Sequence, residues 1–373
     1  MKNLPGPWWV LSLAAIFTLC AGSAFGQQYV FTNDNVANST NSTTALAVDA
    51  KGVLKVLKTY PTGGKSAGSS YFALSPVTSA RTRLGTCLFV SNGGDSTIAA
   101  FQIDLFTGTL APVHGSPFSD GVTGAQHLGV GLAAGRALLF AGNTNNNSLS
   151  VLRISPNCSL KVLKQVTVPG SPAGMKVTPD GAFLIVAYIG QVDSFKIDPT
   201  TGDLTELGPF TPKGSAAGVE ISCDGTTAYF GDAASNTQVE VFSISSTGEL
   251  KELNNFTNQN GQSSDNVVLS IDGKQLYVSN TRSNQITILS VGSNGALTYD
   301  SSVKLNKPGL YALGMATGTS GLDLLVSEQN NPESIGVLAA AGDTLKEVHG
   351  SPFPVIKNGS DPAGLTTVPR GCN

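Results

Sequence analysis

Two carboxylates and one imidazole are the side chains of this sequence best suited to acid–base chemistry. Asp232 lies in YFGDAASN, Glu328 in LLVSEQNN and His127 in GAQHLGV. A general base and a general acid of these types can activate water and protonate a leaving oxygen. Nearby cations stabilise negative charge that develops on a carbonyl oxygen. We therefore expect Asp232 or Glu328 to act as base, His127 as acid, and Arg282 or Lys213 as the electrostatic partner.

Further polar side chains are candidates for binding a small ligand, namely Tyr188, Asn143 and Asn280, together with Arg282 and Lys213. The alternative is structural, because Asn, Asp and Ser in loops often cap turns through bonds to nearby backbone. Three dispersed histidines, with no His-x-His or Cys-x-x-Cys, predict no metal site. No cofactor is expected.

The string HGSPF occurs at residues 114–118 and again at residues 349–353. Each copy follows a predicted strand, TLAPV or TLKEV, and weaker versions without the histidine occur in PGSPAG and GPFTPKGSAAG. A signal that recurs without its histidine marks a connection between structural units. We therefore interpret His114 and His349 as parts of connectors and not as a duplicated active site.

Composition favours short strands joined by many turns. Only 13% of the residues are charged, 40% are apolar, and 43 are glycine. A net charge of −3, without any Lys/Arg cluster, argues against a nucleic-acid partner. Residues 1–26 resemble a secretory leader, with Lys2 before an apolar run and Ala24-Phe25-Gly26 at the cleavage site. The mature chain is expected to be periplasmic or extracellular, monomeric and without a membrane span.

Three segments align as copies of one unit. They are GMKVTPDGAFLIVAYIGQVDSFKIDPTTGDLTEL, GVEISCDGTTAYFGDAASNTQVEVFSISSTGELKEL and NVVLSIDGKQLYVSNTRSNQITILSVGSNGALTYD, which begin at Gly174, Gly218 and Asn266. Each unit holds four short strands, with Asp-Gly after the first and a Gly-centred turn after the third. Glycine supplies the positive φ that tight hairpins need. Each unit is therefore predicted to fold as a four-stranded antiparallel meander.

The remaining copies are looser, with first strands near Tyr71, Leu128, Tyr311 and Ala363, which makes seven units in all. The spacing between these first strands is typical of propeller blades. The chain begins with YVFTNDN, which matches a second strand, and ends with AGLTTVPRG, which matches a first strand. Residues 27–373 are therefore predicted to form a seven-bladed all-β propeller, in which the C-terminal strand completes the N-terminal blade and leaves no inner sheet edge exposed.

Four cysteines remain in the mature chain, and export would allow them to pair. Cys87 and Cys372 are both predicted near turns between first and second strands, on one face of neighbouring blades. We expect a Cys87–Cys372 disulfide that fastens the ring. Cys158 and Cys223 fall in turns of non-adjacent blades, and we expect them to be unpaired.

The GSPF connectors, the PDG and CDG turns, the run LYVSN and the turns TGDL, TGEL and NGAL resemble those of the lactonase-like seven-bladed propellers. That family includes 6-phosphogluconolactonases and carboxymuconate-lactonizing enzymes. The resemblance implies an Arg-His pair at the start of one first strand, a carboxylate at the end of the next second strand, and an Asp-Leu-Gly motif in another blade. These positions fall on Ala217 and Gly218, on Asp232, and on Tyr188-Ile189-Gly190.

Two functions are consistent with these residues. The first is an exported lactonase-type propeller that binds, and hydrolyses, a small carbohydrate-derived lactone or a related acid over the central channel. The second is a non-catalytic propeller that binds an envelope protein or polymer through its loops. Because the Arg-His positions are Ala217 and Gly218, catalysis of the phosphosugar reaction is not expected.

Overall fold

The computed structural model describes residues 28–35, 39–49, 51–67, 74–122, 130–188, 190–233, 237–257, 263–306, 312–317, 323–328, 334–341, 344–355 and 364–368. The predicted leader, His127, Ile189 and Cys372 lie outside these ranges, as do the first-strand residues Tyr71, Leu128, Tyr311 and Ala363. Within them, no helix has the length and apolar character needed to cross a membrane.

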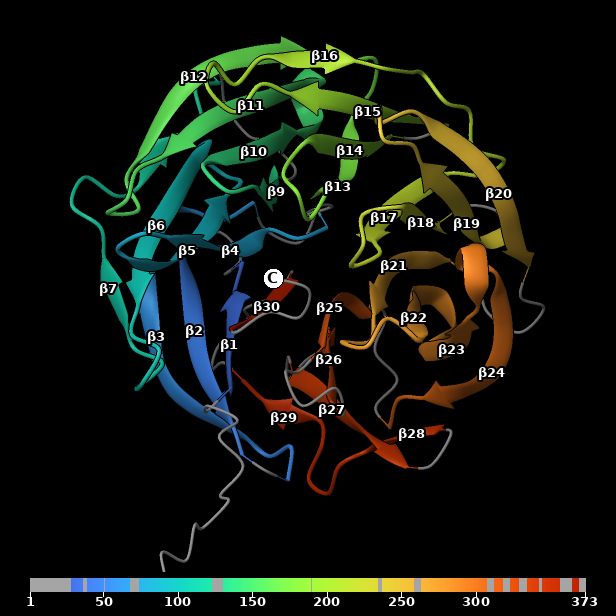
Figure 1. The fold of residues 1–373 in the computed structure, drawn as a ribbon. Helices are drawn as coiled ribbons and strands as arrows, with labels where there is room; N and C mark the ends of the chain where they lie inside the picture. The colour runs from blue at the N-terminus through green and yellow to red at the C-terminus, as the bar shows by residue number, and fades with distance from the viewer. Residues whose placement is uncertain are drawn as a thin grey trace, which may run out of the picture.

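Seven antiparallel sheets stand in a ring around a central channel (Figure 1). Blades 2 and 7 each carry one extra short strand. From the channel outwards, blade 1 holds β30 (Gly364–Val368), β1 (Gln28–Asn33), β2 (Thr40–Val48) and β3 (Leu54–Lys65). Blade 2 holds β4 (Val77–Thr82), β5 (Gly85–Asn92), β6 (Thr97–Ile103), β7 (Leu110–Pro112) and β8 (Phe118–Ser119). Blade 3 holds β9 (Val130–Ala134), β10 (Leu138–Asn143), η1 (Thr144–Asn146), β11 (Ser148–Ile154) and β12 (Leu160–Thr167).

The remaining blades repeat this plan. Blade 4 holds β13 (Pro172–Val177), β14 (Phe183–Tyr188), β15 (Gln191–Ile197) and β16 (Leu204–Glu206). Blade 5 holds β17 (Ala216–Ile221), β18 (Thr227–Asp232), β19 (Thr237–Ile244) and β20 (Leu250–Thr257). Blade 6 holds β21 (Ser264–Leu269), β22 (Gln275–Asn280), η2 (Thr281–Ser283), β23 (Gln285–Val291), η3 (Ser293–Gly295) and β24 (Leu297–Lys304). Blade 7 holds β25 (Ala312–Thr317), β26 (Asp323–Glu328), β27 (Ser334–Ala341), β28 (Thr344–Glu347) and β29 (Phe353–Pro354).

The predicted ring closure is confirmed. Strand β30 pairs antiparallel with β1, in a register that runs from Tyr29↔Val368 to Asn33↔Gly364. The last described strand of the chain is therefore the innermost strand of the first blade. The closure pairs the inner edge of β1, which would otherwise be exposed.

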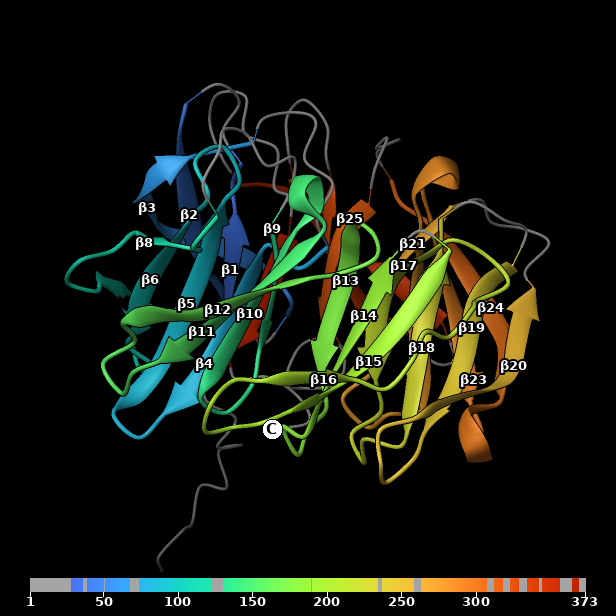
Figure 2. The ribbon, with the colours of Figure 1, turned by 90° about the horizontal axis from the view of Figure 1, so that it is seen from above.

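Apolar side chains fill the seven spaces between neighbouring blades. Second strands such as FLIVAY in β14 are buried at every position, because both of their faces meet other blades. Figure 2 shows the strands running between two faces of the ring. We call the face that carries the turns between first and second and between third and fourth strands the turn face, and the opposite face the loop face.

The Asp-Gly turns of the aligned units adopt one conformation. Asp180, Asp224 and Asp272 each accept a hydrogen bond from the backbone N–H two residues later. The glycines that follow them have φ values of 78°, 74° and 69°. The turn chemistry predicted from the sequence is therefore confirmed.

Both copies of HGSPF are connectors, as predicted. The Ser116 Oγ accepts a hydrogen bond of 2.9 Å from the N–H of Ala100 in β6, and the Ser351 Oγ accepts the equivalent bond from Val337 in β27. The short strands β8 and β29 that follow pair with the same third strands. Both His114 and His349 are exposed at the turns that begin these connectors.

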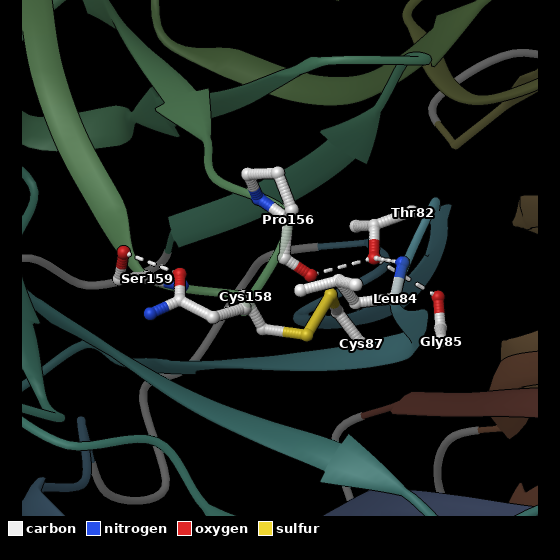
Figure 3. Close-up of a disulfide and its surroundings, with 8 residues drawn as sticks. Thr82, Leu84, Gly85, Cys87, Pro156, Cys158 and Ser159 are labelled. Carbon is white, nitrogen blue, oxygen red and sulfur yellow. Dashed lines mark hydrogen bonds between the residues drawn. A yellow bond between two sulfur atoms is a disulfide. The ribbon is translucent and has the colours of Figure 1, made fainter.

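The predicted Cys87–Cys372 disulfide is wrong, because Cys87 is bonded to Cys158 (Figure 3). Cys158 lies in the turn between β11 and β12 of blade 3, and Cys87 lies in β5 of blade 2. The Thr82 Oγ1 also donates a 2.8 Å hydrogen bond to the Pro156 carbonyl across the same interface. The expectation that Cys158 and Cys223 are unpaired is wrong too, since both are disulfide-bonded.

The physical reason for the error lies in the turns between third and fourth strands. Cys158 occupies the position that is glycine in the equivalent turns of blades 1, 2, 4, 5 and 6, two residues before the leucine that begins the fourth strand, and it has a φ of 69°. The equivalent Gly108, Gly202 and Gly248 each touch the preceding blade, at Tyr29, Leu163 and Phe183. A cysteine at this position therefore reaches the preceding blade, which is where Cys87 lies.

Candidate functional site

Five of the predicted site residues are the last residues of second strands and face equivalent surroundings in their blades. Every second strand ends in a buried polar side chain at the loop face. From blade 1 to blade 7 these are Asn33, Asn92, Asn143, Tyr188, Asp232, Asn280 and Glu328, each exposed by no more than 1%. The position is thus a feature of the repeat.

Most of these side chains bond within their own blade. The Asn143 amide donates to Ser150 Oγ at 2.9 Å, and the Asn280 amide donates to Thr287 Oγ1 at 2.8 Å. The Glu328 carboxylate accepts a hydrogen bond from Ser334 Oγ at 3.3 Å. Burial raises the pKa of the Tyr188 hydroxyl far above its ordinary range, and the nearby Asp193 carboxylate adds to this. These contacts hold the second and third strands together where the loops begin.

Asp232 and Glu328 do not come together, because blade 6 lies between their blades. Asp232 instead forms a cluster with two buried carboxylates that were not predicted, Glu240 in β19 and Asp265 in β21. Repulsion from Asp232 raises the pKa of both, although burial is the larger cause in each. We call these three side chains the blade 5–6 carboxylate cluster. No group of three or more His, Cys, Asp or Glu side chains in the described part of the chain is arranged to hold a metal ion.

Backbone N–H groups of the connector before β17 bind two carboxylates of this cluster. The Lys213 and Gly214 N–H groups donate to Glu240 at 2.9 and 2.8 Å, and the Ser215 N–H donates to Asp232 Oδ1 at 2.9 Å. The Lys213 ammonium points elsewhere and pairs with Glu252 at 2.7 Å. Asp232 and Glu240 therefore position this connector. Because the Lys213 ammonium is paired with Glu252, its position does not support the predicted role of Lys213 as an electrostatic partner.

Asp265 has the environment of a candidate general base. Burial raises its pKa to about 6, while hydrogen bonds from Thr281 and Ser263 and the charge of Arg282 oppose the rise. The carboxylate is therefore largely ionised at neutral pH, with a guanidinium nearby. A base whose pKa lies close to the working pH transfers protons efficiently.

The positions where the resemblance implies an Arg-His pair are filled differently. Ala217 is buried and packs against Leu74, a residue of the segment before β4. At Gly218, a Cβ would lie 2.7 Å from the Asp265 carbonyl oxygen, so no larger side chain fits without a backbone shift. The Asp-Leu-Gly equivalent cannot be compared in full, since Ile189 lies outside the described residues.

The central channel holds a cavity of about 750 Å³ that reaches the turn face. An ion pair crosses between inner strands inside it, with Lys176 Nζ of β13 at 2.6 Å from Glu220 Oε1 of β17. These two residues were not predicted, although the aligned units place them in one column, GMKV above GVEI. Opposite charges at one repeat position in successive units could have predicted this ion pair, because successive inner strands are neighbours around the channel.

Comparison with known proteins identifies the architecture. The family model described as "Lactonase, 7-bladed beta-propeller" matches residues 85–221 and 222–308. No curated protein matches the chain in sequence.

Among solved structures, a candidate 6-phosphogluconolactonase from Bacteroides fragilis is 19% identical, with a TM-score of 0.74 over 93% of this chain and 99% of that chain. The periplasmic gluconolactonase of Pseudomonas aeruginosa is 18% identical, with a TM-score of 0.70 over 92% of this chain and 99% of that chain. At these identities the likeness is one of fold.

Proposed function

Because the chain belongs to the lactonase family of seven-bladed β-propellers, we propose that it is an exported propeller which binds a small carbohydrate-derived lactone and hydrolyses it at the loop face. The observation that carries the proposal is Asp265, with its pKa of about 6 and its neighbour Arg282. The leader-like segment at residues 1–26 and the Cys87–Cys158 disulfide support export, since disulfides persist in oxidising compartments.

In the proposed reaction, Asp265 removes a proton from water as the water oxygen attacks the lactone carbonyl carbon. Arg282 stabilises the oxyanion that forms. The ring C–O bond then breaks, and the ring oxygen takes a proton, for which His127 remains the proposed acid. Ser263 and Thr281 orient the Asp265 carboxylate through their hydroxyl groups.

The test is turnover of D-glucono-1,5-lactone and D-galactono-1,4-lactone by the mature chain from Gln27. Turnover is measured as release of acid at a rate above that in buffer alone. We expect Asp265→Asn and Arg282→Gln to lower kcat/KM by about a hundredfold or more. Because the base must be ionised, the rate should rise with pH through about 6. The control is Asp300→Asn, which removes a carboxylate from the outer strand β24. Absence of turnover by the wild type, or equal rates in all four proteins, would contradict the proposal.

One observation favours the second candidate function, a non-catalytic propeller that binds an envelope protein or polymer. Leu74, Ala217 and Ala233 form an apolar contact where the resemblance implies the Arg-His pair. This candidate predicts no lactone turnover together with retention of envelope material on the immobilised protein. Clear turnover with no retained partner would exclude it.

A further inference from the structure

The two ends of the central channel differ. At the loop-face end, the segment 74–76 crosses the inner strands. The Leu74 N–H donates to the Ala173 carbonyl of blade 4 at 3.4 Å, and the Ser75 carbonyl accepts a bond of 2.9 Å from Leu132 of blade 3. Leu74 also packs against Ala217 of blade 5. The segment that leads into blade 2 thus spans the channel, and Ser75 lines the inner end of the 750 Å³ cavity.

At the other end, the cavity reaches the turn face between residues of the turns that follow the inner strands. Arg81 and Arg136 line this part, and Lys176 and Glu220 lie deeper. The charged groups lining the cavity are therefore three cations and one carboxylate, an excess of two positive charges, and the fifth ionisable group, the Tyr29 hydroxyl, is neutral. Its volume lies within the range of about 300–1,000 Å³ that is usual for small-ligand sites.

The cations have donors to spare. Neither Arg81 nor Arg136 forms a salt bridge within the described ranges, although Asp180 lies near Arg136. Lys176 Nζ is paired with Glu220, and an ammonium group has three N–H donors, so two remain. Both guanidinium groups belong to exposed residues, so they are accessible from the solvent at the turn face.

We propose that the turn-face end of the central channel is a second ligand site, separate from the loop face, which binds a small organic dianion between Arg81, Arg136 and Lys176. The excess of two positive charges matches a dianion. Guanidinium groups bind carboxylate and phosphate through paired N–H donors. The segment 74–76 separates this site from the loop face.

The experiment is calorimetric titration of the disulfide-intact mature chain with four probes of similar size. L-Malate is a dicarboxylate and glycerol 3-phosphate a phosphate dianion, whereas lactate is a monoanion and glycerol is neutral. We expect one or both dianions to bind, and the stronger of the two identifies the carboxylate or the phosphate class. Affinity should fall as salt is added, because the attraction is screened. Equal binding of glycerol, or no binding of either dianion at millimolar concentration, would overturn the proposal.

Matched variants locate the site. Arg81→Gln and Arg136→Gln should each weaken dianion binding about tenfold, the value of one charge-assisted hydrogen bond. The control is Arg83→Gln, since Arg83 is exposed two residues from Arg81 but does not line the cavity. An equal loss in the Arg83 variant would overturn the assignment.

The outcome is independent of the loop-face proposal. Asp265→Asn is expected to lower lactone turnover as above and to leave dianion binding unchanged. If turnover is absent and the dianion binds, only the lactonase proposal fails. If turnover is present and no dianion binds, only the turn-face site fails.

Discussion

Burial sets the protonation of several acidic side chains at the level of single residues. Asp34 and Asp265 have pKa values raised to about 6, and burial is the largest cause for each. Asp120 is the strongest case, because burial raises its pKa to about 7 and the Asp95 charge adds to this. One of its oxygens accepts a 2.8 Å bond from Val122, while the other has no partner among the described residues.

A raised pKa means that the folded state binds the proton more tightly than the unfolded chain. The contribution of Asp120 to stability is therefore full below its unfolded value of 3.8 and is lost as the pH rises through about 7. Because Asn does not titrate, the stability of the Asp120→Asn variant relative to the wild type should increase from pH 5 to pH 8. Each 1 kcal/mol of this increase corresponds to about 2 °C in melting temperature.

Thermal unfolding at pH 5 and pH 8 measures this difference. The control is Asp104→Asn, since Asp104 is exposed and its pKa is lowered by the Phe106 N–H. Its effect on melting temperature should be the same at both pH values, because Asp104 is ionised throughout. A constant difference for Asp120→Asn as well would contradict the prediction.

Glycine has two separate roles at the scale of the turns. Gly273 and Gly248 both have positive φ, at 69° and 89°. A Cβ at Gly273 would meet nothing within 4 Å, whereas a Cβ at Gly248 would lie 2.3 Å from the ring of Phe183 in the neighbouring blade. Gly273→Ala should therefore lower the free energy of unfolding by about 1–2 kcal/mol through backbone strain alone. Gly248→Ala should lower the free energy of unfolding by about 1–3 kcal/mol more than Gly273→Ala does, because the added methyl group overpacks against Phe183. Urea denaturation of the two variants measures both terms, and equal losses would show that the contact with Phe183 is not rigid.

The turn that contains Cys158 replaces this glycine contact by a covalent bond. The Cys87–Cys158 disulfide closes a sequence separation of 71 residues, for which chain entropy predicts about 4 kcal/mol of stabilisation. The double substitution Cys87→Ala with Cys158→Ala should lose about this amount in urea denaturation. Because φ at residue 158 is positive, Cys87→Ala with Cys158→Gly should recover about 1 kcal/mol. Variants are preferable to a reductant, since Cys223 is also in a disulfide. A glycine variant no more stable than the alanine variant would refute the account of the turn.

Ring closure determines stability at the scale of the whole molecule. Removing residues 364–373 deletes β30 and exposes the edge of β1 along its whole pairing register. We expect the shortened chain to lose cooperative unfolding and to associate, because unpaired inner edges bind other strands. Circular dichroism and size-exclusion chromatography measure both effects. A peptide of residues 360–373 added in trans should restore the monomer, and a shortened chain that melts like the full one would contradict the prediction.

The blade plan, the ring closure and the connector role of HGSPF could be predicted from the amino-acid sequence. These features follow from local rules, since alternating strands and positive-φ glycines act within a few residues of one another. The sequence also placed Asp232, Tyr188 and Glu328 at equivalent strand ends. It did not reveal that these ends are buried inside their blades.

Contacts between side chains of different blades depend on how the blades are arranged in the ring. Cys87 pairs with Cys158 because a turn between third and fourth strands touches the preceding blade. Lys176 pairs with Glu220 because successive inner strands are neighbours around the channel. Asp265 joins Asp232 because β21 of blade 6 lies against β18 of blade 5. Leu74 lies against Ala217 because one connector crosses the channel. Such contacts depend on the relative positions of whole blades, which local sequence patterns do not contain.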